Sequence, residues 1–554
     1  MAASGSVPVL ILKEGATRSR GRTALRNNIM AARIIGEVLK STLGPRGMDK
    51  MLVDSLGDVT ITNDGATILK EIDVQHPAAK IVVEASKAQD SEVGDGTTSV
   101  SILSSELLKR AEELIEKKIH PTLVVTGYKR ASEKALKLLD ELSVSVNIND
   151  RAMLKKVAMT AMGAKSINVA RETLADIAID AIGLIAEKSD DEWVVDIDQV
   201  QVTKKTGESI FDTRLVNGII LDKEVVHSGM PRSVKDAKIA LIKSPIEIEK
   251  TEYSAEIRIK DPTMMKAFLD EETNMLQRMV QKIKDAGANF VACQKGIDDI
   301  AQYFMSKEGI MAVRRVKESD IEKLSRATGA DLITNLDDLT EESLGYAEDV
   351  IEQKIGEDKM VFVEGCKNPK SGGILIRGGL ERFVDEAERA MHDSLFVVAD
   401  IYKSNKIVAG GGAIETEIAK HVRDYASQVG GKEQLAIEAF ADALESIPIT
   451  LAENAGFDPI DIMVDLKAAH SKSDGVWTGV NVLGGGVADL MKAGVVEPVV
   501  VKEQMIKSAT EAASMILRID DMIASSKAPP MPGGMPGGMP GGMPGGMPGG
   551  MPPM

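Results

Sequence analysis

Apolar positions recur at helical spacing through both ends of the chain. Near the N-terminus one such stripe ends at Gly44-Pro45, a pair that stops helices; its members are Leu25, Ile29, Ala32, Ile35, Leu39 and Leu43. Pro77 suits the first turn of another helix, which runs to Val93. Similar patterns over 415–429 and 433–453 predict that the last third of the chain is helical as well.

Two short runs before Pro77 have the pattern of strands rather than helices. They cover residues 51–54 and 59–62 and flank the turn Ser55-Leu56-Gly57-Asp58. Asn63-Asp64-Gly65 follows as a second tight turn and leads into a short helix. Residues 17–150 are therefore expected to be mostly helical, with one small hairpin.

The middle third has a different pattern, in which short apolar runs alternate with helical stretches. The apolar runs are 219–221, 239–242, 290–293 and 360–363, and the helical stretches include 274–286 and 320–328. This alternation predicts an α/β region with buried strands. Because helical sequence lies on both sides of it, the first and last thirds are expected to form one discontinuous domain.

Length, composition and charge narrow the class of protein. A chain of 554 residues has room for roughly three domains. The net charge of −17 argues against nucleic acid as the main partner, because binding a phosphate backbone requires a basic surface. No apolar run approaches the ~18 residues that span a bilayer, so no membrane association is expected. Cys293 and Cys366 form no Cys-x-x-Cys motif, which fits a reducing cytoplasm without disulfides or structural zinc.

The C-terminus is a low-complexity segment. From Pro529 to Met554 the chain repeats Met-Pro-Gly-Gly. Proline and glycine disfavour both helix and sheet, so residues 528–554 are expected to be a disordered tail, either a flexible tether or an inert end.

The segment Gly94–Val100 carries the clearest candidate chemistry. Its glycines let the backbone approach an anion closely, and Asp95 offers a hard oxygen ligand for Mg²⁺. Thr97, Thr98 and Ser99 would lie at a helix N-terminus, where backbone N–H groups and the helix dipole favour phosphate. The alternative is a well-capped, solvated helix start with no ligand. Taken by itself, the segment leaves both readings open.

The remaining glycine clusters are weaker signals. Gly410–Ala413 opens a predicted helix, and Gly484–Gly486 and Gly494–Pro498 follow it. There is no Gly-x4-Gly-Lys-Ser/Thr motif, so the P-loop class of nucleotide-binding proteins is disfavoured. The six histidines have no metal-ligand spacing.

Several motifs together, in their order along the chain, resemble a known family. They are Leu43–Met48, Asn63–Thr67, Val93–Val100, His392–Leu395, Gly410–Ala413 and Glu453–Ile460. Over residues 8–525 the chain resembles the group II chaperonins of the chaperonin 60/TCP-1 family, and among them the archaeal thermosome. With this resemblance, the Gly94–Val100 segment is interpreted as a nucleotide site.

The resemblance implies a multidomain fold that combines α and α/β parts. A mostly helical, discontinuous equatorial ATPase domain would comprise 1–150 and 405–527. A small intermediate hinge domain would comprise 151–218 and 371–404. An α/β apical domain for substrate binding would span 219–370, with a helical lid protrusion over about 246–284 that is rich in Met and Leu.

The resemblance also assigns roles to individual residues. Asp64 and Asp393 match the two carboxylates that position and activate the attacking water, and Asp95 matches the Mg²⁺ ligand. The residues implied to contact nucleotide are Leu43, Gly44, Pro45, Asn63, Gly65, Gly96, Thr97, Thr98, Ser99, Lys165, Gly411, Gly412, Asn481 and Glu497. Among these, Lys165 would approach the γ-phosphate, Glu497 the ribose and Asn481 the adenine.

The implied function is an ATP-dependent chaperone of the cytoplasm. ATP and Mg²⁺ would be the cofactors, with K⁺ as a candidate second cation. The partners would be non-native proteins and further subunits, in a homo- or hetero-oligomeric double ring of eight or nine subunits per ring. A built-in lid would make a separate co-chaperonin unnecessary.

Two other classes of function are carried as alternatives. A stand-alone Mg²⁺-dependent ATP hydrolase would need polar substrate-binding residues near the γ-phosphate, whereas the middle third offers apolar runs and Met-rich helices. A structural scaffold with vestigial nucleotide binding is disfavoured because Asp64, Asp95 and Asp393 are all present.

Overall fold

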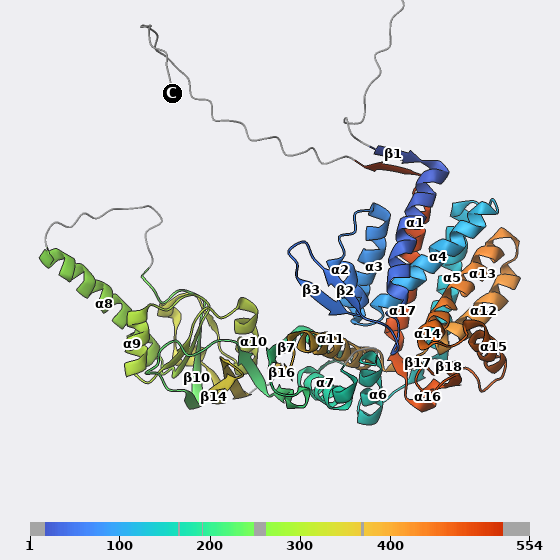
Figure 1. Ribbon diagram of the computed structural model, residues 1–554. Coiled ribbons are helices and arrows are strands. Elements are labelled where there is room, and N and C mark those ends of the chain that lie inside the picture. Colours follow the sequence, from blue (N-terminus) through green and yellow to red (C-terminus); the bar gives the residue numbers. More distant parts are fainter. Residues whose placement is uncertain (1–16, 164–166, 191, 249–261, 367–370, 525–554) are drawn as a thin grey trace, which may run out of the picture. The chain divides into compact units, whose positions relative to one another are not determined.

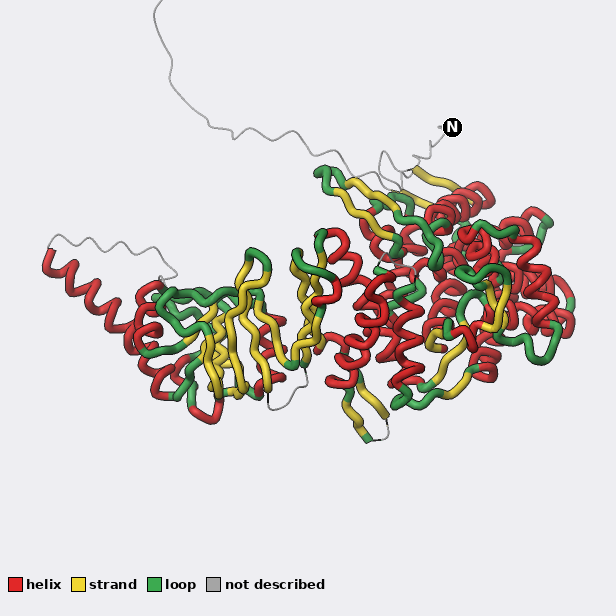
Figure 2. The backbone as a smooth tube through the Cα atoms, turned by 60° about the horizontal axis from the view of Figure 1, so that its bottom comes forward, coloured by secondary structure: helices red, strands yellow, loops and turns green. Residues whose placement is uncertain are grey.

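A computed structural model describes residues 17–163, 167–190, 192–248, 262–366 and 371–524 (Figures 1 and 2). The chain divides into two compact units, one formed by residues 1–25 with 519–554 and the other by residues 26–518. Lys165, residues 249–261 of the expected protrusion and the tail from residue 528 lie outside the described residues.

The unit that contains both chain ends is built on a two-stranded antiparallel ladder. Strand β1 (Thr17–Arg20) pairs with β21 (Asp521–Ala524), so that Arg18 lies opposite Ile523. Arg18 also forms an ion pair with Asp521. Backbone hydrogen bonds therefore hold together two segments, 17–20 and 521–524, that are far apart in the sequence.

The larger unit begins with the rest of α1 and contains a bundle of long helices (Figure 1). They are α1 (Gly21–Lys40), α2 (Gly65–Glu71), α3 (Pro77–Val93), α4 (Thr97–Glu116), α5 (Pro121–Leu142), α12 (Ala413–Val429), α13 (Gly431–Leu444), α14 (Ser446–Ala455), α15 (Pro459–His470) and α17 (Val499–Leu517). Every residue of α4 from Ser99 to Leu108 is buried, because α3, α13 and α17 all pack against it. A helix that is buried on all sides forms the centre of a bundle rather than its surface.

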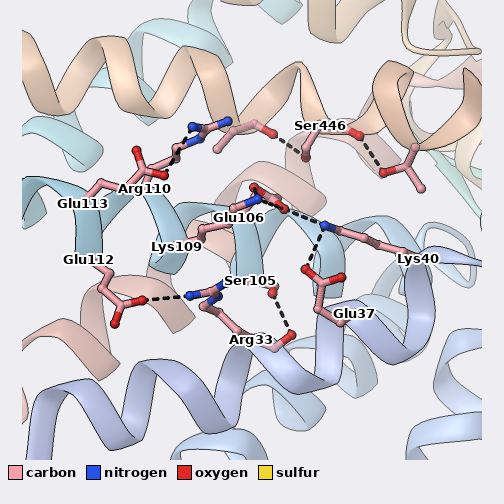
Figure 3. A network of polar contacts seen from close by, with 12 residues as sticks. Arg33, Glu37, Lys40, Ser105, Glu106, Lys109, Arg110, Glu112, Glu113 and Ser446 are labelled. Carbon is pink, nitrogen blue, oxygen red and sulfur yellow. Dashed lines mark hydrogen bonds and ion pairs between the residues drawn. The ribbon is translucent and has the colours of Figure 1, made fainter. Parts of the chain in front are cut away.

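A polar network joins α1 to α4 in this bundle (Figure 3). The carboxylate of Glu106 is buried and lies 2.7 Å from Lys40 Nζ, while Lys109 lies 3.2 Å from the same carboxylate. Arg33 contacts Glu112 at 2.8 Å, about two turns away from the first contact on each helix. Hydrogen-bonded cationic partners offset the cost of burying the Glu106 charge and fix α1 on α4.

Residues 218–366 form a mixed sheet with helices packed against it (Figure 2). The strand order is β12-β11-β10-β14-β15-β9, and β13 also pairs with β10; β10, β11, β12 and β13 are parallel, whereas β14, β15 and β9 are antiparallel to their neighbours. The elements are β9 (Gly218–Leu221), β10 (Ser233–Ile242), β11 (Phe290–Cys293), β12 (Met311–Val313), β13 (Leu332–Ile333), β14 (Gly345–Ile355), β15 (Asp358–Cys366), α8 (Pro262–Asp285), α9 (Asp299–Lys307) and α10 (Glu318–Thr328). One continuous core of residues 219–366 fills this region.

A third group of elements carries residues that matter for the site. It comprises α6 (Arg151–Ala161), α7 (Arg171–Ile185), α11 (Glu381–Ser404), the hairpin β5 (Glu187–Ser189) and β6 (Glu192–Val194), and the sheet β7 (Val200–Thr206), β16 (Gly372–Gly378) and β8 (Arg214–Val216). Strand β16 lies between its neighbours, parallel to β7 and antiparallel to β8. The core of this group also includes Val93, Val496 and Val501, which flank the candidate site.

The remaining strands of the larger unit are short. They are the hairpin β2 (Lys50–Val53) and β3 (Val59–Thr62), the three-stranded sheet of β4 (Val144–Ser145), β17 (Lys406–Ala409) and β20 (Val496–Pro498), and the hairpin β18 (Thr478–Val480) and β19 (Val487–Asp489), which leads into α16 (Leu490–Ala493). The described residues contain no helix with the length and apolar content that crossing a bilayer requires.

Most of the sequence-based expectations for individual elements are confirmed. The predicted hairpin is β2–β3, the helix from Pro77 to Val93 is α3, and the four apolar runs of the middle third all lie in strands. The N-terminal helix ends at Lys40, so Leu43 lies beyond it, in a turn.

The segment 433–453 is helical, as the sequence predicts, but the helix is not continuous. The segment forms two helices, α13 and α14, which break at Glu445. Pro448 explains the break, because proline has no N–H to donate to Leu444 and its ring clashes with that carbonyl in a continuous helix.

Both cysteines are buried and unbridged. Cys293 lies at the end of β11 and Cys366 at the end of β15. Burial raises the pKa of each thiol to about 11. A thiol in such surroundings remains protonated at neutral pH and behaves as a small apolar side chain.

Candidate functional site

A cavity of about 590 Å³ lies in the larger unit, among helix starts and loops that are distant in sequence. Its lining comes from the turn after α1, the loops before α2 and α4, helices α6 and α11, the start of α12, and the segment around β18–β20. The sequence-predicted residues that line it are Leu43, Gly44, Pro45, Asn63, Asp64, Asp95, Gly96, Thr97, Thr98, Ser99, Asp393, Gly411, Gly412, Asn481 and Glu497. Gly65 lies just outside this lining, and Lys165 lies outside the described residues.

The first turn of α4 faces the cavity without a capping side chain. Gly96 is the N-cap residue and has a φ of 83°, a left-handed conformation that side chains disfavour. The first N–H groups of a helix have no partner within the helix, and the helix dipole adds partial positive charge there. The N–H groups of Thr97, Thr98 and Ser99 therefore form a ready anion site.

A second helix begins at the same cavity in the same way. Gly411 and Gly412 have φ values of 62° and 78°, and Gly412 caps α12 without a side chain. A Cβ on Gly412 would lie 3.0 Å from the Cα of Pro448, so the close packing of α14 also requires glycine. Two uncapped helix starts at one cavity suit a ligand with several phosphates.

Asp64 is fixed by hydrogen bonds from two helices. It caps α2, since its Oδ2 accepts a bond from Thr67 N at 2.8 Å, and its Oδ1 accepts one from the Thr97 hydroxyl at 3.2 Å. Gly65 permits this arrangement, because a Cβ there would lie 2.8 Å from Thr98 N. Gly65 thus permits the close packing of α2 on the start of α4.

Asp95 lies in the turn between α3 and α4. Its Oδ1 accepts a hydrogen bond from Gly96 N at 2.6 Å, and its backbone carbonyl accepts one from Gln89 Nε2 at 2.8 Å. The same amide nitrogen of Gln89 donates to Val501 O at 3.1 Å. The loop that carries Asp95 is thereby tied to the start of α17.

Asp393 approaches the cavity from α11 and is only 9% exposed. The helix packs closely on the loop that carries Asp95, since a Cβ on Gly94 would lie 2.3 Å from Phe396 Cβ. Three aspartates, from three segments more than 30 residues apart, therefore face one cavity that is also lined by helix starts.

The oxygen atoms around the starts of α2 and α4 suit a hard divalent cation. Carboxylate and hydroxyl oxygens of Asp64, Asp95, Asp393 and Thr97 are the ligand types that Mg²⁺ prefers. Within the described ranges no three acidic, His or Cys side chains are close enough to enclose an ion by themselves. This arrangement fits Mg²⁺, which usually binds one or two carboxylates and completes its shell with phosphate and water.

The turn Leu43-Gly44-Pro45 forms another wall of the cavity. Asn454 on α14 holds it in place, because its Nδ2 donates to the carbonyls of Lys40 and Leu43, each at 2.8 Å. Gly44 has a φ of 81°, and a Cβ there would lie 2.4 Å from Leu451 Cδ2. The sequence signal for this turn was the glycine-proline pair.

The far end of the cavity is formed by β18, β20 and the start of α17. Glu497 on β20 lines the cavity, and Asn481 follows β18, whose Val480 N donates to Gly411 O at 2.9 Å. The side chain of Asn481 accepts a hydrogen bond from Gly484 N at 2.9 Å, which closes the turn toward β19.

Sequence reasoning missed several charged residues near the site. Lys156, Arg171 and Lys502 line the cavity, and Asp400 lies two turns after Asp393 on α11. Lys502 had no sequence signal of its own, because a lysine that follows a short apolar run such as Val499–Val501 is ordinary on an amphipathic helix.

Asp400 is a buried carboxylate whose titration is displaced toward neutral pH. Only 2% of the residue is exposed, and its Oδ2 has no hydrogen-bond partner within the described ranges. Burial, partly countered by Lys403 and reinforced by Asp95, raises the pKa of Asp400 from 3.8 to about 7.

Asp400→Asn is therefore expected to stabilise the protein at pH 8 but not at pH 4. The unfolded Asp400 loses its proton near pH 4 and the folded one near pH 7, so the folded state is disfavoured as the pH rises through this window. A shift of this size corresponds to on the order of 4 kcal/mol. Urea unfolding of both proteins at pH 4 to 8, without nucleotide, measures the gain. If the two proteins differed in unfolding free energy by the same amount at every pH, this prediction would be wrong.

Comparison with known proteins gives one consistent result. A model of the TCP-1/cpn60 chaperonin family matches residues 35–527. Thermosome subunit beta of Sulfolobus acidocaldarius is 58% identical over 521 residues, which cover 94% of each chain. Thermosome subunit alpha of Archaeoglobus fulgidus and a thermosome subunit of Pyrococcus horikoshii are 55% and 56% identical, over 95% of this chain and 96% of theirs.

Proposed function

Because the chain belongs to the TCP-1/cpn60 chaperonin family, we propose that it is an ATP-dependent chaperone whose cavity binds and hydrolyses ATP. The main support for this proposal is that two uncapped helix starts line the same cavity as Asp64, Asp95 and Asp393. The helix starts would hold the phosphates, and the carboxylates would serve the metal and the water. Phosphoryl transfer requires that the charge of the phosphates is neutralised and that the attacking water is positioned. Residues of one chain would then meet both requirements.

In the proposed reaction Asp64 and Asp393 orient a water molecule toward the terminal phosphorus. The water oxygen forms a bond to phosphorus as the bond to the β–γ bridging oxygen breaks, and a carboxylate accepts the proton that the water loses. The hydrogen bonds from Thr67 N and the Thr97 hydroxyl fix the orientation of Asp64. Asp393 comes from α11, so a movement of this helix relative to α2 would switch hydrolysis on or off.

We propose Asp95 as the protein ligand for Mg²⁺. Bound Mg²⁺ would neutralise charge on the phosphate oxygens during transfer. The hydrogen bond from Gly96 N holds Oδ1 of Asp95 and so fixes the direction of its other oxygen. Arg171 and Lys156 are cations of the cavity lining that can add to this neutralisation.

The proposed domain layout follows the family. Residues 1–150 and 405–527 would form the equatorial domain, 151–218 and 371–404 the intermediate domain, and 219–370 the apical domain. The separate core of residues 219–366 supports the last of these. Phe268, Leu269 and Met275 are exposed on α8, and this supports the proposal that 246–284 serve as a lid that contacts clients.

Chaperonins of this family are oligomeric double rings that bind non-native proteins. For this chain we propose eight or nine subunits per ring, of one or more kinds, with no separate co-chaperonin. We place the protein in the cytoplasm, without nucleic acid or membrane as a partner. A stand-alone hydrolase and a nucleotide-binding scaffold are not favoured, because family membership extends over most of the chain.

The purified protein is expected to form double rings that hydrolyse ATP only with Mg²⁺ and that suppress aggregation of an unfolded client. Electron micrographs with and without ATP measure ring size and closure, and light scattering of a chemically unfolded client measures chaperone activity. A particle of one or two subunits with full ATPase activity would contradict the chaperonin proposal and favour the stand-alone hydrolase.

A further inference from the structure

Two charged residues of α11 pack against strand β3, which leads directly to Asp64. Arg389 Nε and Nη2 lie 3.0 and 2.8 Å from Glu386 Oε2, one turn earlier on the same helix. The same Nη2 lies 3.5 Å from the carbonyl oxygen of Ile61, and the hydroxyl of Thr62 lies 3.5 Å from Glu386 Oε2. The guanidinium–carboxylate pair is therefore placed on the last two residues of β3.

This ion pair is largely removed from water. The side chains of Arg389 and Glu386 are 22% and 8% exposed, and Thr62 is 1% exposed. The other carboxylate oxygen of Glu386, Oε1, is buried and has no hydrogen-bond partner within the described part of the chain. A buried carboxylate depends strongly on its cationic partner, because an unpaired buried charge is costly. The pair therefore fixes the position of α11 on β3 better than an exposed ion pair would.

A second arginine keeps the helix and the strand side by side. Arg382, two turns before Arg389 on α11, donates a hydrogen bond to the carbonyl oxygen of Val59 at the start of β3. From Val59 to Thr62 the strand rises by about 10 Å, and from Arg382 to Arg389 the helix rises by about the same distance. The two elements therefore run in the same direction and stay in register along the whole of β3.

The same register brings the two candidate catalytic carboxylates to one end. Asp64 follows Thr62 by two residues, and Asp393 follows Arg389 by one turn on the same face of α11. The hydroxyl of Thr62 also accepts a hydrogen bond from Asp64 N at 3.1 Å. A shift of α11 along β3 would thus move Asp393 relative to Asp64, and a loss of the contacts of Thr62 would loosen the backbone that carries Asp64.

We propose that Arg389 is a positioning residue for hydrolysis, which together with Glu386 holds α11 on β3 at the spacing that lets Asp393 and Asp64 contact the same water molecule. This proposal rests on the proposed function, because it takes the two aspartates to orient the attacking water. Arg389, Glu386 and Thr62 are not among the described residues that line the cavity. Their loss should therefore lower kcat and leave ATP binding in place.

The test measures the rate constant of ATP hydrolysis in a single turnover, together with the affinity for a fluorescent ATP analogue, in the assembled protein. Arg389→Met should slow hydrolysis by about 10- to 100-fold, since a misplacement of about 1 Å has an effect of this size. Nucleotide affinity should be nearly unchanged, because both helix starts are intact. Arg389→Lys keeps the charge and should recover part of the rate.

Lys204→Met is the matched control for the loss of an ion pair on α11. Lys204 lies on β7 and pairs with Asp385 and Glu388 of α11 at 2.8 and 2.7 Å. These contacts hold the same helix but do not involve β3. The variant is therefore expected to hydrolyse ATP at the parent rate, and a loss as large as that of Arg389→Met would overturn the specific role of the contact with β3.

Thr62→Val tests the connection to Asp64, because valine has the shape of threonine without its hydroxyl. This variant should also slow hydrolysis. Adding it to Arg389→Met should cause little further loss, since the two changes interrupt the same set of contacts. Independent losses that multiply in the double variant would overturn the connection through Thr62.

A double variant keeps the proposal testable if Arg389→Met does not fold. Arg389→Met with Glu386→Gln leaves no unpaired buried charge and should show the same slow hydrolysis with nucleotide affinity retained. Hydrolysis at the parent rate in either folded variant would overturn the proposal. A loss of nucleotide affinity in either folded variant would overturn it as well, because Arg389 would then support the cavity as a whole. A parent protein that does not hydrolyse ATP would instead contradict the proposed function.

Discussion

Asp393→Ala should stop ATP hydrolysis while leaving ATP binding in place. The expected loss in kcat is at least about 100-fold, since general-base and water-positioning groups contribute on this scale. Binding should persist because the two helix starts, Gly96–Ser99 and Gly411–Ala413, remain intact. Alanine also favours helix, so α11 should keep its structure.

The measurement is single-turnover hydrolysis together with the affinity for a fluorescent ATP analogue. Glu381→Ala is the matched control, because Glu381 is an exposed carboxylate in the first turn of the same helix. Unchanged hydrolysis in Asp393→Ala would remove this residue from the reaction. Lost binding would show that α11 supports the cavity rather than the chemistry.

Asp95→Asn should raise the Mg²⁺ concentration needed for hydrolysis by roughly 100-fold, because changes to metal-supporting groups already cost 10–100-fold in affinity. Asparagine keeps an oxygen that can accept the hydrogen bond from Gly96 N, so the loop should hold its shape. What is lost is the negative charge that attracts the cation.

Titration of ATPase rate against Mg²⁺ in the parent and in Asp95→Asn measures this shift. Glu92→Gln serves as the control, since Glu92 is exposed and lies three residues earlier, on α3. Equal midpoints in parent and variant would assign the metal to other oxygens of the cavity, with those of Asp64 as the next candidates.

Local chemistry explains which parts of the fold and the site could be predicted from sequence. Gly94, Gly96 and Pro77 act on their own turns and helix ends, so the residues themselves define these features. The same holds for Asp64, which caps the helix that it begins. Short apolar runs likewise located four of the strands within residues 218–366, namely β9, β10, β11 and β15.

Contacts between distant segments could not be predicted in this way. Asp393 is one polar position on a long amphipathic helix, and nothing in its neighbourhood indicates that it faces Asp64, more than 300 residues away. Family resemblance supplied that assignment. The contact between Lys502 and Glu415 depends on how α17 packs against the start of α12, which no periodicity encodes.

The burial of Cys293 and Cys366 has a practical consequence for spectroscopy. With pKa values near 11, these thiols carry almost no thiolate at neutral pH and should react slowly with maleimides. A cysteine introduced at an exposed position, such as Leu269 on α8, would then take up a fluorophore selectively in the otherwise natural sequence. Distances between labelled subunits could thus be followed through the nucleotide cycle without first removing the native thiols.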